Sequence, residues 1–110
     1  MNVSITDLAT NPATITISTY EGPLTVSVDT ALRLANGTTS PVSPSTVLLI
    51  NNDSGTVVTL TDGCTVSGSK VNQIIRGTEL AAGFNYLLIV KFGDGAGNTQ
   101  ASFTAIHCPL

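Results

Sequence analysis

Residues 91–100, KFGDGAGNTQ, hold three glycines, an aspartate and an asparagine directly after a strongly apolar run. Loops of this composition serve as phosphate cradles, calcium loops or hairpin turns. A phosphate loop needs a lysine after its glycines and a helix behind them, a dinucleotide loop needs GxGxxG spacing, and a calcium loop needs several carboxylates. The stretch meets none of these requirements, since its one acid is Asp94 and a strand-like run follows. The spacing predicts a hairpin turn that joins strands at 85–93 and 99–108.

The single histidine, His107, stands beside Cys108 near the end of the chain. Neighbouring residues on a strand point to opposite faces, so this pair does not form a nucleophile–base couple. No two carboxylates share a motif, and the isolated acids are interpreted as solvated residues of turns and strand ends: Asp7, Glu21, Asp53, Asp62 and Glu79. We expect no catalytic, cofactor-binding or metal-binding residue.

Two cysteines, Cys64 and Cys108, lie 44 positions apart, form no CxxC motif and lack the partners of a zinc site. A disulfide that closed this loop would stabilise the fold by about 4 kcal/mol in the chain-entropy treatment. The other interpretation is a pair of free thiols in a reducing compartment. We expect both cysteines to be reduced.

The composition describes a folded chain with few charges. Its 110 residues fit one domain, and charged residues are 10% of them, against about 25% in an average protein. The four cations of the chain are scattered: Arg33, Lys70, Arg76 and Lys91. Four separate cations cannot neutralise the roughly six to ten phosphates of a nucleic-acid footprint, and they form no polybasic patch for anionic lipid. Nucleic acid and membranes are therefore not expected as partners.

The first twelve residues, MNVSITDLATNP, have neither a cationic start nor an apolar core, so they do not form a secretion signal. No run approaches the roughly 20 apolar residues of a membrane span. We expect a protein that stays inside the cell that makes it, or a sequence that has lost its leader.

Apolar side chains recur with a period of two through most of the chain. In ATITIST (13–19), Ile15 and Ile17 share one face and polar residues take the other. Further strand-like runs lie at residues 23–29, 46–52, 56–62, 63–70, 70–77, 85–93 and 99–108. About seven or eight short strands without an amphipathic helix predict an all-β domain, built as an antiparallel sandwich or barrel.

Residues 30–45 are less regular. They fit one or two helical turns, capped by Asp29 or Thr30 and stopped by Gly37, and they fit a short edge strand and loop equally well. We expect residues 1–110 to form a single domain, in which residues 1–12 can make an extended N-terminal arm.

The run GTELAAGFNYLLIVKF, residues 77–92, contains Leu80, Gly83 and Tyr86 with the spacing Leu-x-x-Gly-x-x-Tyr. It resembles the step into the penultimate strand of fibronectin type III and related immunoglobulin-like domains, with Ala82 where proline is usual. The resemblance implies an immunoglobulin-like β-sandwich with a tyrosine corner, in which the Tyr86 hydroxyl bonds to backbone across the loop. The chain departs from the pattern in having no tryptophan and in placing Cys108 after the last strand.

The run that begins TVSGSKVNQIIRG at residue 65 and ends HCPL resembles small immunoglobulin-like virion proteins of tailed bacteriophages. The residues in comparable positions are Val66, Gly68, Val71, Gln73, Gly77, Tyr86, Gly95 and Pro109. The resemblance implies a capsid cement or decoration protein, or a tail accessory. Such a protein would be made in the host cytoplasm, reside in the virion and bind a major capsid protein or another virion protein.

Two strands carry apolar residues on both faces, and the immunoglobulin-like resemblance implies that they are neighbours in one sheet. In 46–52, Val47 and Leu49 lie on one face and Leu48 and Ile50 on the other, and Leu87 and Ile89 point outward from 85–93. An exposed apolar patch usually marks an interface. These strands therefore predict an interface formed by Val47, Leu49, Leu87 and Ile89. We expect self-association as a dimer or trimer. The alternative is that residues 30–45 fold over this face.

The sequence thus leads to two hypotheses of different classes. The first is a non-catalytic structural protein of a phage virion that acts by self-association and docking. The second is a cell-surface adhesion or carbohydrate-binding module of a larger exported protein, which would be extracellular. A sugar site needs an aromatic platform, for which the chain offers no tryptophan and only Tyr20 and Tyr86 as tyrosines.

Overall fold

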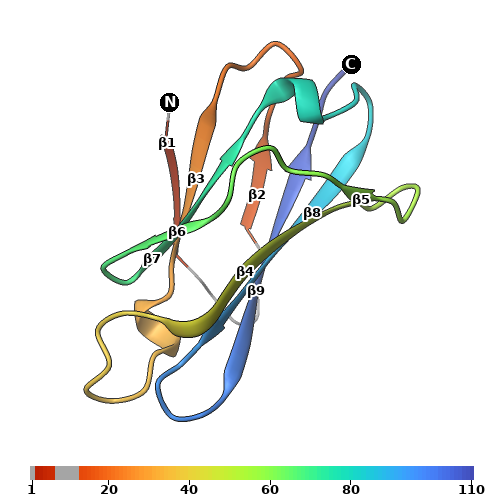
Figure 1. The fold of residues 1–110 in the computed structure, drawn as a ribbon. Coiled ribbons are helices and arrows are strands. Elements are labelled where there is room, and N and C mark those ends of the chain that lie inside the picture. Colours follow the sequence, from red (N-terminus) through yellow and green to blue (C-terminus); the bar gives the residue numbers. More distant parts are fainter. Residues whose placement is uncertain (1, 7–12) are drawn as a thin grey trace.

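The computed structural model describes residues 2–6 and 13–110, which form two sheets packed as a β-sandwich (Figure 1). The strands are β1 (Asn2–Thr6), β2 (Ala13–Thr16), β3 (Leu24–Asp29), β4 (Val42–Asn51), β5 (Val57–Val58), β6 (Thr65–Ser67), β7 (Lys70–Ile75), β8 (Asn85–Gly93) and β9 (Thr99–His107). Two single-turn 3-10 helices lie in the connections, η1 (Ala31–Arg33) and η2 (Gly77–Glu79). The prediction of an all-β sandwich is confirmed.

The strands divide into a four-stranded sheet, in the order β1-β3-β7-β6, and a five-stranded sheet, in the order β2-β9-β8-β4-β5. The chain crosses between the sheets after β1, β2, β3, β5 and β7 and makes hairpins at β4–β5, β6–β7 and β8–β9. The sheets hydrogen-bond within themselves and do not close into a barrel. Two pairs are parallel, β1 with β3 and β2 with β9, so the expected antiparallel arrangement holds only for the other pairs.

The N-terminal segment differs from the expected arm. Residues 2–6 form β1, which pairs along its whole length with β3, from Asn2 opposite Thr25 to Thr6 opposite Asp29. Residues 7–12, Asp7 among them, lie outside the described residues. With β1 the described residues form nine strands, more than the seven or eight expected.

The core consists of alternate residues from both sheets. Those of β8 are the four expected to point inward, Tyr86, Leu88, Val90 and Phe92, each no more than 3% exposed. Gln73 of β7 is a polar residue among these buried positions. Its side-chain amide donates to the backbone carbonyls of Asp62 and Ile74 at 2.8 and 3.0 Å, which satisfies both of its N–H groups.

The segment 30–45 contains the helical turn η1 followed by an irregular connection to β4. The carboxylate of Asp29 accepts the Ala31 N–H at 3.1 Å, while the Thr30 hydroxyl donates to the Ser69 carbonyl. The helical alternative is therefore the one that the structure has. Thr30 is the residue before η1, the Asp29 carboxylate bonds to the first N–H of the turn, and the turn ends at Arg33 and not at Gly37.

Both cysteines are free thiols, as expected. Cys64 is half-buried, and its Sγ lies 3.4 Å from the Ser45 carbonyl oxygen, to which it donates. Cys108 is fully buried, and the loss of hydration raises the pKa of its thiol. The adjacent His107 is exposed, so the two side chains lie on opposite faces of the sheet.

Candidate interaction surface

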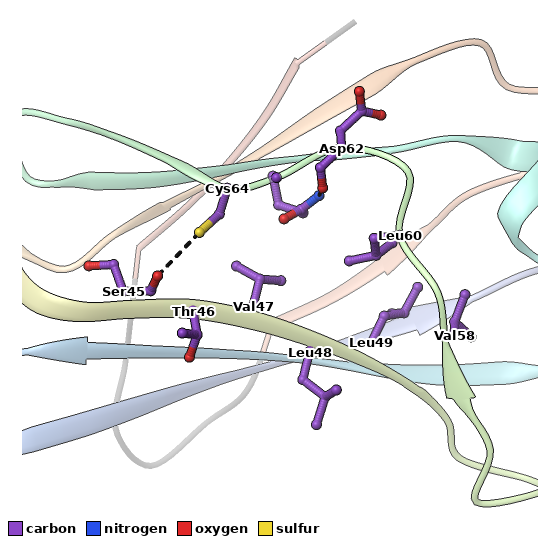
Figure 2. Close-up of a pocket in the computed structure, with 11 residues that line it drawn as sticks. Ser45, Thr46, Val47, Leu48, Leu49, Val58, Leu60, Asp62 and Cys64 are labelled. Atoms are coloured by element: carbon purple, nitrogen blue, oxygen red, sulfur yellow. Dashed lines mark hydrogen bonds between the residues drawn. The ribbon is translucent and has the colours of Figure 1, made fainter.

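Strand β4 directs its apolar side chains to both faces of the five-stranded sheet. Figure 2 shows Val47 and Leu49 on the side of β4 that faces Leu60 and Cys64, and Leu48 on the other side. The residues around this site line a pocket of about 350 Å³. Leu49 is 0% exposed and Val47 packs against the core. The prediction that Val47 and Leu49 line an outer interface is therefore wrong.

The reason lies in the register of β4 with β8. Leu49 is opposite Leu88 and Val47 is opposite Val90, and side chains of directly opposed residues share a face. Since Leu88 and Val90 point into the core, their β4 partners do so as well.

The outward residues of the five-stranded sheet form a continuous apolar surface. Leu48 is opposite Ile89, and Ile50 is opposite both Leu87 and Val57, while Ile89 is also opposite Phe103 of β9. We call this set the outer apolar face: Leu48, Ile50, Val57, Leu87, Ile89 and Phe103. Leu48, Val57 and Phe103 are 37%, 56% and 44% exposed, and the other three are half-buried among their neighbours.

Four residues of this face were not assigned to it from the sequence: Leu48, Ile50, Val57 and Phe103. Phe103 stands between Ser102 and Thr104, and the polarity of these two neighbours would place the aromatic ring inside. The structure has the reverse, because Ser102 and Thr104 are 3% and 1% exposed while Phe103 lies outside. The register of β9 with β8, with Phe103 opposite Ile89, is the signal that identifies it.

The outer surface of the four-stranded sheet is different in character. Its outward residues are mainly polar: Thr25 and Ser27 of β3, Asn72 and Ile74 of β7, and Thr65 of β6. The Ser27 hydroxyl donates to the Asn72 side-chain oxygen on this surface. One sheet thus has the polar outer surface that water favours, and the other has not.

Segment 30–45 does not cover the outer apolar face. The Arg33 guanidinium donates to the Ala101 carbonyl at 2.6 Å and to the Gln100 side chain at 2.8 Å, and it lies 5.7 Å from the centre of the buried Phe92 ring. The Ala35 N–H donates to the Asp94 carbonyl. These contacts hold the segment at one end of the sandwich, against the β8–β9 hairpin (Figure 1).

Polar residues border the outer apolar face at the two ends of β8. At one end, exposed Lys91 is opposite Thr46 of β4. At the other end, the Asn85 N–H donates to the Asp53 carboxylate at 2.8 Å, and the Asn85 side-chain oxygen lies 2.8 Å from Nδ1 of His107.

The three corner residues lie on the connection from η2 to β8 and at the start of β8. Tyr86 is 3% exposed, and its hydroxyl accepts the Ala81 N–H at 2.7 Å, as the resemblance implied. Leu80 is buried in the core. Gly83 has φ of +86°, which a residue with a side chain rarely adopts, and its N–H donates to the Cys108 carbonyl at 2.8 Å.

The glycine-rich stretch is the turn between β8 and β9, as its spacing predicted. One carboxylate oxygen of Asp94 accepts the N–H groups of Ala96 and Asn98, and the other accepts the side-chain amide of Gln100. The Ala96 bond, followed by the Gln100 bond, lowers the pKa of Asp94. The carboxylate is thus occupied within the hairpin.

Within residues 2–6 and 13–110, no three histidine, cysteine, aspartate or glutamate side chains gather where a metal ion would bind. In the same ranges no helix has the length and apolar character to cross a membrane. Compared with known proteins, the chain matches no family model, no curated protein and no solved structure.

Proposed function

We propose that this protein is a non-catalytic structural protein with an immunoglobulin-like fold, which acts by self-association and docking through its outer apolar face. Its place of action, on the resemblance of residues 65–110, is the virion of a tailed bacteriophage. There it would serve as a capsid cement or decoration protein, or as a tail accessory, bound to a major capsid protein or another virion protein.

The order of the strands supports the immunoglobulin-like part of this proposal. In immunoglobulin domains the first, second, fifth and fourth strands share one sheet, and the last two pair with the third in the other. Here β1, β3, β7 and β6 stand in the first arrangement and β9, β8 and β4 in the second, with β2 and β5 added at the edges. The bond from the Tyr86 hydroxyl to the backbone of the preceding loop is a further supporting feature.

The observation that carries the functional proposal is the outer apolar face itself. Six large apolar side chains on neighbouring strands of one sheet face outward, while the other sheet is polar on its outside. The molecule measures 44 × 24 × 21 Å, so a broad side offers on the order of 1,000 Å², above the roughly 800 Å² per partner of a stable interface. A second copy of the chain would cover this surface.

Replacement of Leu87 and Ile89 by threonine tests the proposal. Threonine keeps the preference for a strand but removes most of the apolar surface, and a fully buried Leu or Ile contributes about 1.5–3 kcal/mol. We expect sedimentation velocity to show a dimer or trimer for the wild type and an association weaker by several powers of ten for the double variant. Thermal unfolding of the monomer should change little, because neither residue belongs to the core.

Ile74→Thr is the matched control, since Ile74 lies on the outer surface of the four-stranded sheet and should not affect association. A wild type that stays monomeric at high protein concentration would contradict the proposal. So would a double variant that unfolds instead of dissociating.

The virion setting has a separate test in the genes beside this one. Capsid and portal genes alongside would support the phage assignment, and genes of exported surface proteins would favour an adhesion or carbohydrate-binding module. Such a module would need exposed aromatic rings to bind a sugar. The ring of Tyr86 is buried, and of the two tyrosines only Tyr20, 96% exposed in the loop between β2 and β3, is accessible.

A further inference from the structure

The two ends of the outer apolar face carry opposite charges. Strand β8 crosses the face from Asn85, whose N–H is bonded to the Asp53 carboxylate, to Lys91 at the far end. Six residues of extended chain span about 20 Å. The surface is therefore a strip with an acid at one end, apolar side chains in the middle and a cation at the other end.

Symmetry limits how two such strips pack together. Two identical faces in contact are related by a two-fold axis that lies in the plane of contact. If sheets pack with their strands roughly aligned, that axis runs along the strands or across them. An axis along the strands brings the Lys91 ends of both copies together and likewise the two Asp53 ends. An axis across the strands brings each Lys91 to the Asp53 end of the second copy.

We propose that two copies pack outer face to outer face about a two-fold axis that runs across the strands, so that Lys91 of each copy lies against Asp53 of the other. This inference rests on the proposed function, because it presupposes association through the outer apolar face. Coulomb attraction favours this arrangement twice per dimer, whereas the other aligned arrangement repeats a like-charge contact at both ends.

The apolar side chains agree with the same axis. Leu87 and Ile89 lie symmetrically about the level of Leu88, which is the midpoint between Asn85 and Lys91. An axis across the strands at this level sets Leu87 of one copy over Ile89 of the second. On β4 it sets Ile50 over Leu48 in the same way, since these are their register partners.

Charge reversal in separate and mixed samples tests the arrangement. Lys91→Glu and Asp53→Lys each turn two attractive contacts into repulsive ones, and we expect each variant to self-associate about tenfold more weakly at low ionic strength. In an equimolar mixture both contacts become attractive again, so a heterodimer should form with the wild-type affinity. Added salt should reduce these differences. Lys70→Glu, on the outer surface of the four-stranded sheet, is the control without effect.

Asp53→Lys also removes the acceptor of the Asn85 N–H, so Asn52→Lys serves as a second variant. It adds a cation at the same end and leaves the Asp53 hydrogen bond in place. Single variants that self-associate as tightly as the wild type, or a mixture without heterodimer, would overturn the proposed arrangement. If Leu87→Thr/Ile89→Thr still dissociates the protein in that case, only the arrangement fails. A monomeric wild type would overturn both the arrangement and the proposed function.

Discussion

Tyr86 fixes the loop after β7 to the second sheet with a single hydroxyl group. Its ring is buried in the core, and its oxygen accepts the Ala81 N–H at 2.7 Å. The loop is held from both sides, because Leu80 packs into the same core and the Gly83 N–H bonds to the Cys108 carbonyl. Within these seven residues, Leu80 fills the core, the Tyr86 hydroxyl binds the backbone, and Gly83 supplies the positive φ of the turn.

Tyr86→Phe keeps the ring and removes only the hydroxyl. The Ala81 N–H then loses its acceptor, which costs about 1–3 kcal/mol of unfolding free energy for a buried group, and we expect the lower half of this range because Ala81 itself is exposed. Urea unfolding measures the change as a lower midpoint with an unchanged slope. Tyr20→Phe, at an exposed tyrosine, is the matched control, and an unshifted midpoint for Tyr86→Phe would show that the hydroxyl does not stabilise the corner.

The bond between Tyr86 and Ala81 was expected from the family resemblance of residues 77–92, and it joins residues five positions apart. The bond from Gly83 to Cys108 spans 25 positions and was not expected. The sequence did not show whether Val47 and Leu49 point into the core or outward, because apolar residues on both sides of β4 leave the alternation without a preferred direction. Only pairing with a strand about 40 residues later decides which set is buried, since Leu49 is opposite Leu88. A shift of one residue in that register would exchange the two sets.

The β8–β9 hairpin is the element that the sequence specified most fully. Its strands pair without interruption from Asn85 opposite His107 to Gly93 opposite Thr99. In the turn, Gly95 and Gly97 have φ of +87° and +90°, and Asp94 accepts three hydrogen bonds. The glycines adopt the positive φ angles that the turn needs, and the Asp94 carboxylate accepts its hydrogen bonds. The conformation of the turn is thus specified by its own residues.

Asp94→Asn should make the stability of this element independent of the charge on residue 94. The pKa of Asp94 is lowered from its ordinary value of 3.8, so ionisation stabilises the fold above that pH, and the stabilisation is lost as pH falls through the lowered folded-state value. In the variant an amide N–H₂ also faces the Gln100 amide donor.

We expect Asp94→Asn to have a lower urea midpoint than the wild type at neutral pH. The difference should shrink and disappear as the pH falls below 3.8, and unfolding curves recorded from neutral to strongly acidic pH measure it. A difference that stays constant over this range would show that the geometry of the side chain, and not its charge, stabilises the turn.

Of the four edge strands, β1 is the one that the sequence did not predict. Strand β1 has only two apolar residues, Val3 and Ile5, and it pairs in parallel with β3, which lies about twenty residues further along the chain. Strand β5, inside the predicted run 56–62, is only two residues long, because its pairing with β4 ends at Val58 and the chain then crosses to the other sheet. A short strand with a distant parallel partner, such as β1, leaves too weak a pattern in the sequence.

At the scale of the molecule, the two outer surfaces divide its roles. The four-stranded sheet meets water with polar residues such as Thr25, Ser27 and Asn72. In the five-stranded sheet, β4 has apolar residues on both faces. One face of this sheet packs in the core, and the other is exposed and available for contact with a partner. A monomer in water has no use for the second apolar surface, which is why we infer a partner from it.

Leu48 and Leu49 are neighbours on β4, and their replacement should have opposite consequences. Leu49 is 0% exposed, so Leu49→Thr removes buried methyl groups and buries a hydroxyl, at a cost of about 2–5 kcal/mol in unfolding free energy. Leu48 is 37% exposed on the outer apolar face, so Leu48→Thr should change stability by less than about 0.5 kcal/mol but weaken self-association roughly tenfold or more. Thermal unfolding and sedimentation velocity of both variants separate the two effects. If Leu48→Thr lowers the melting temperature as much as Leu49→Thr does, or if neither changes the association, then the outward side of β4 is not a contact surface.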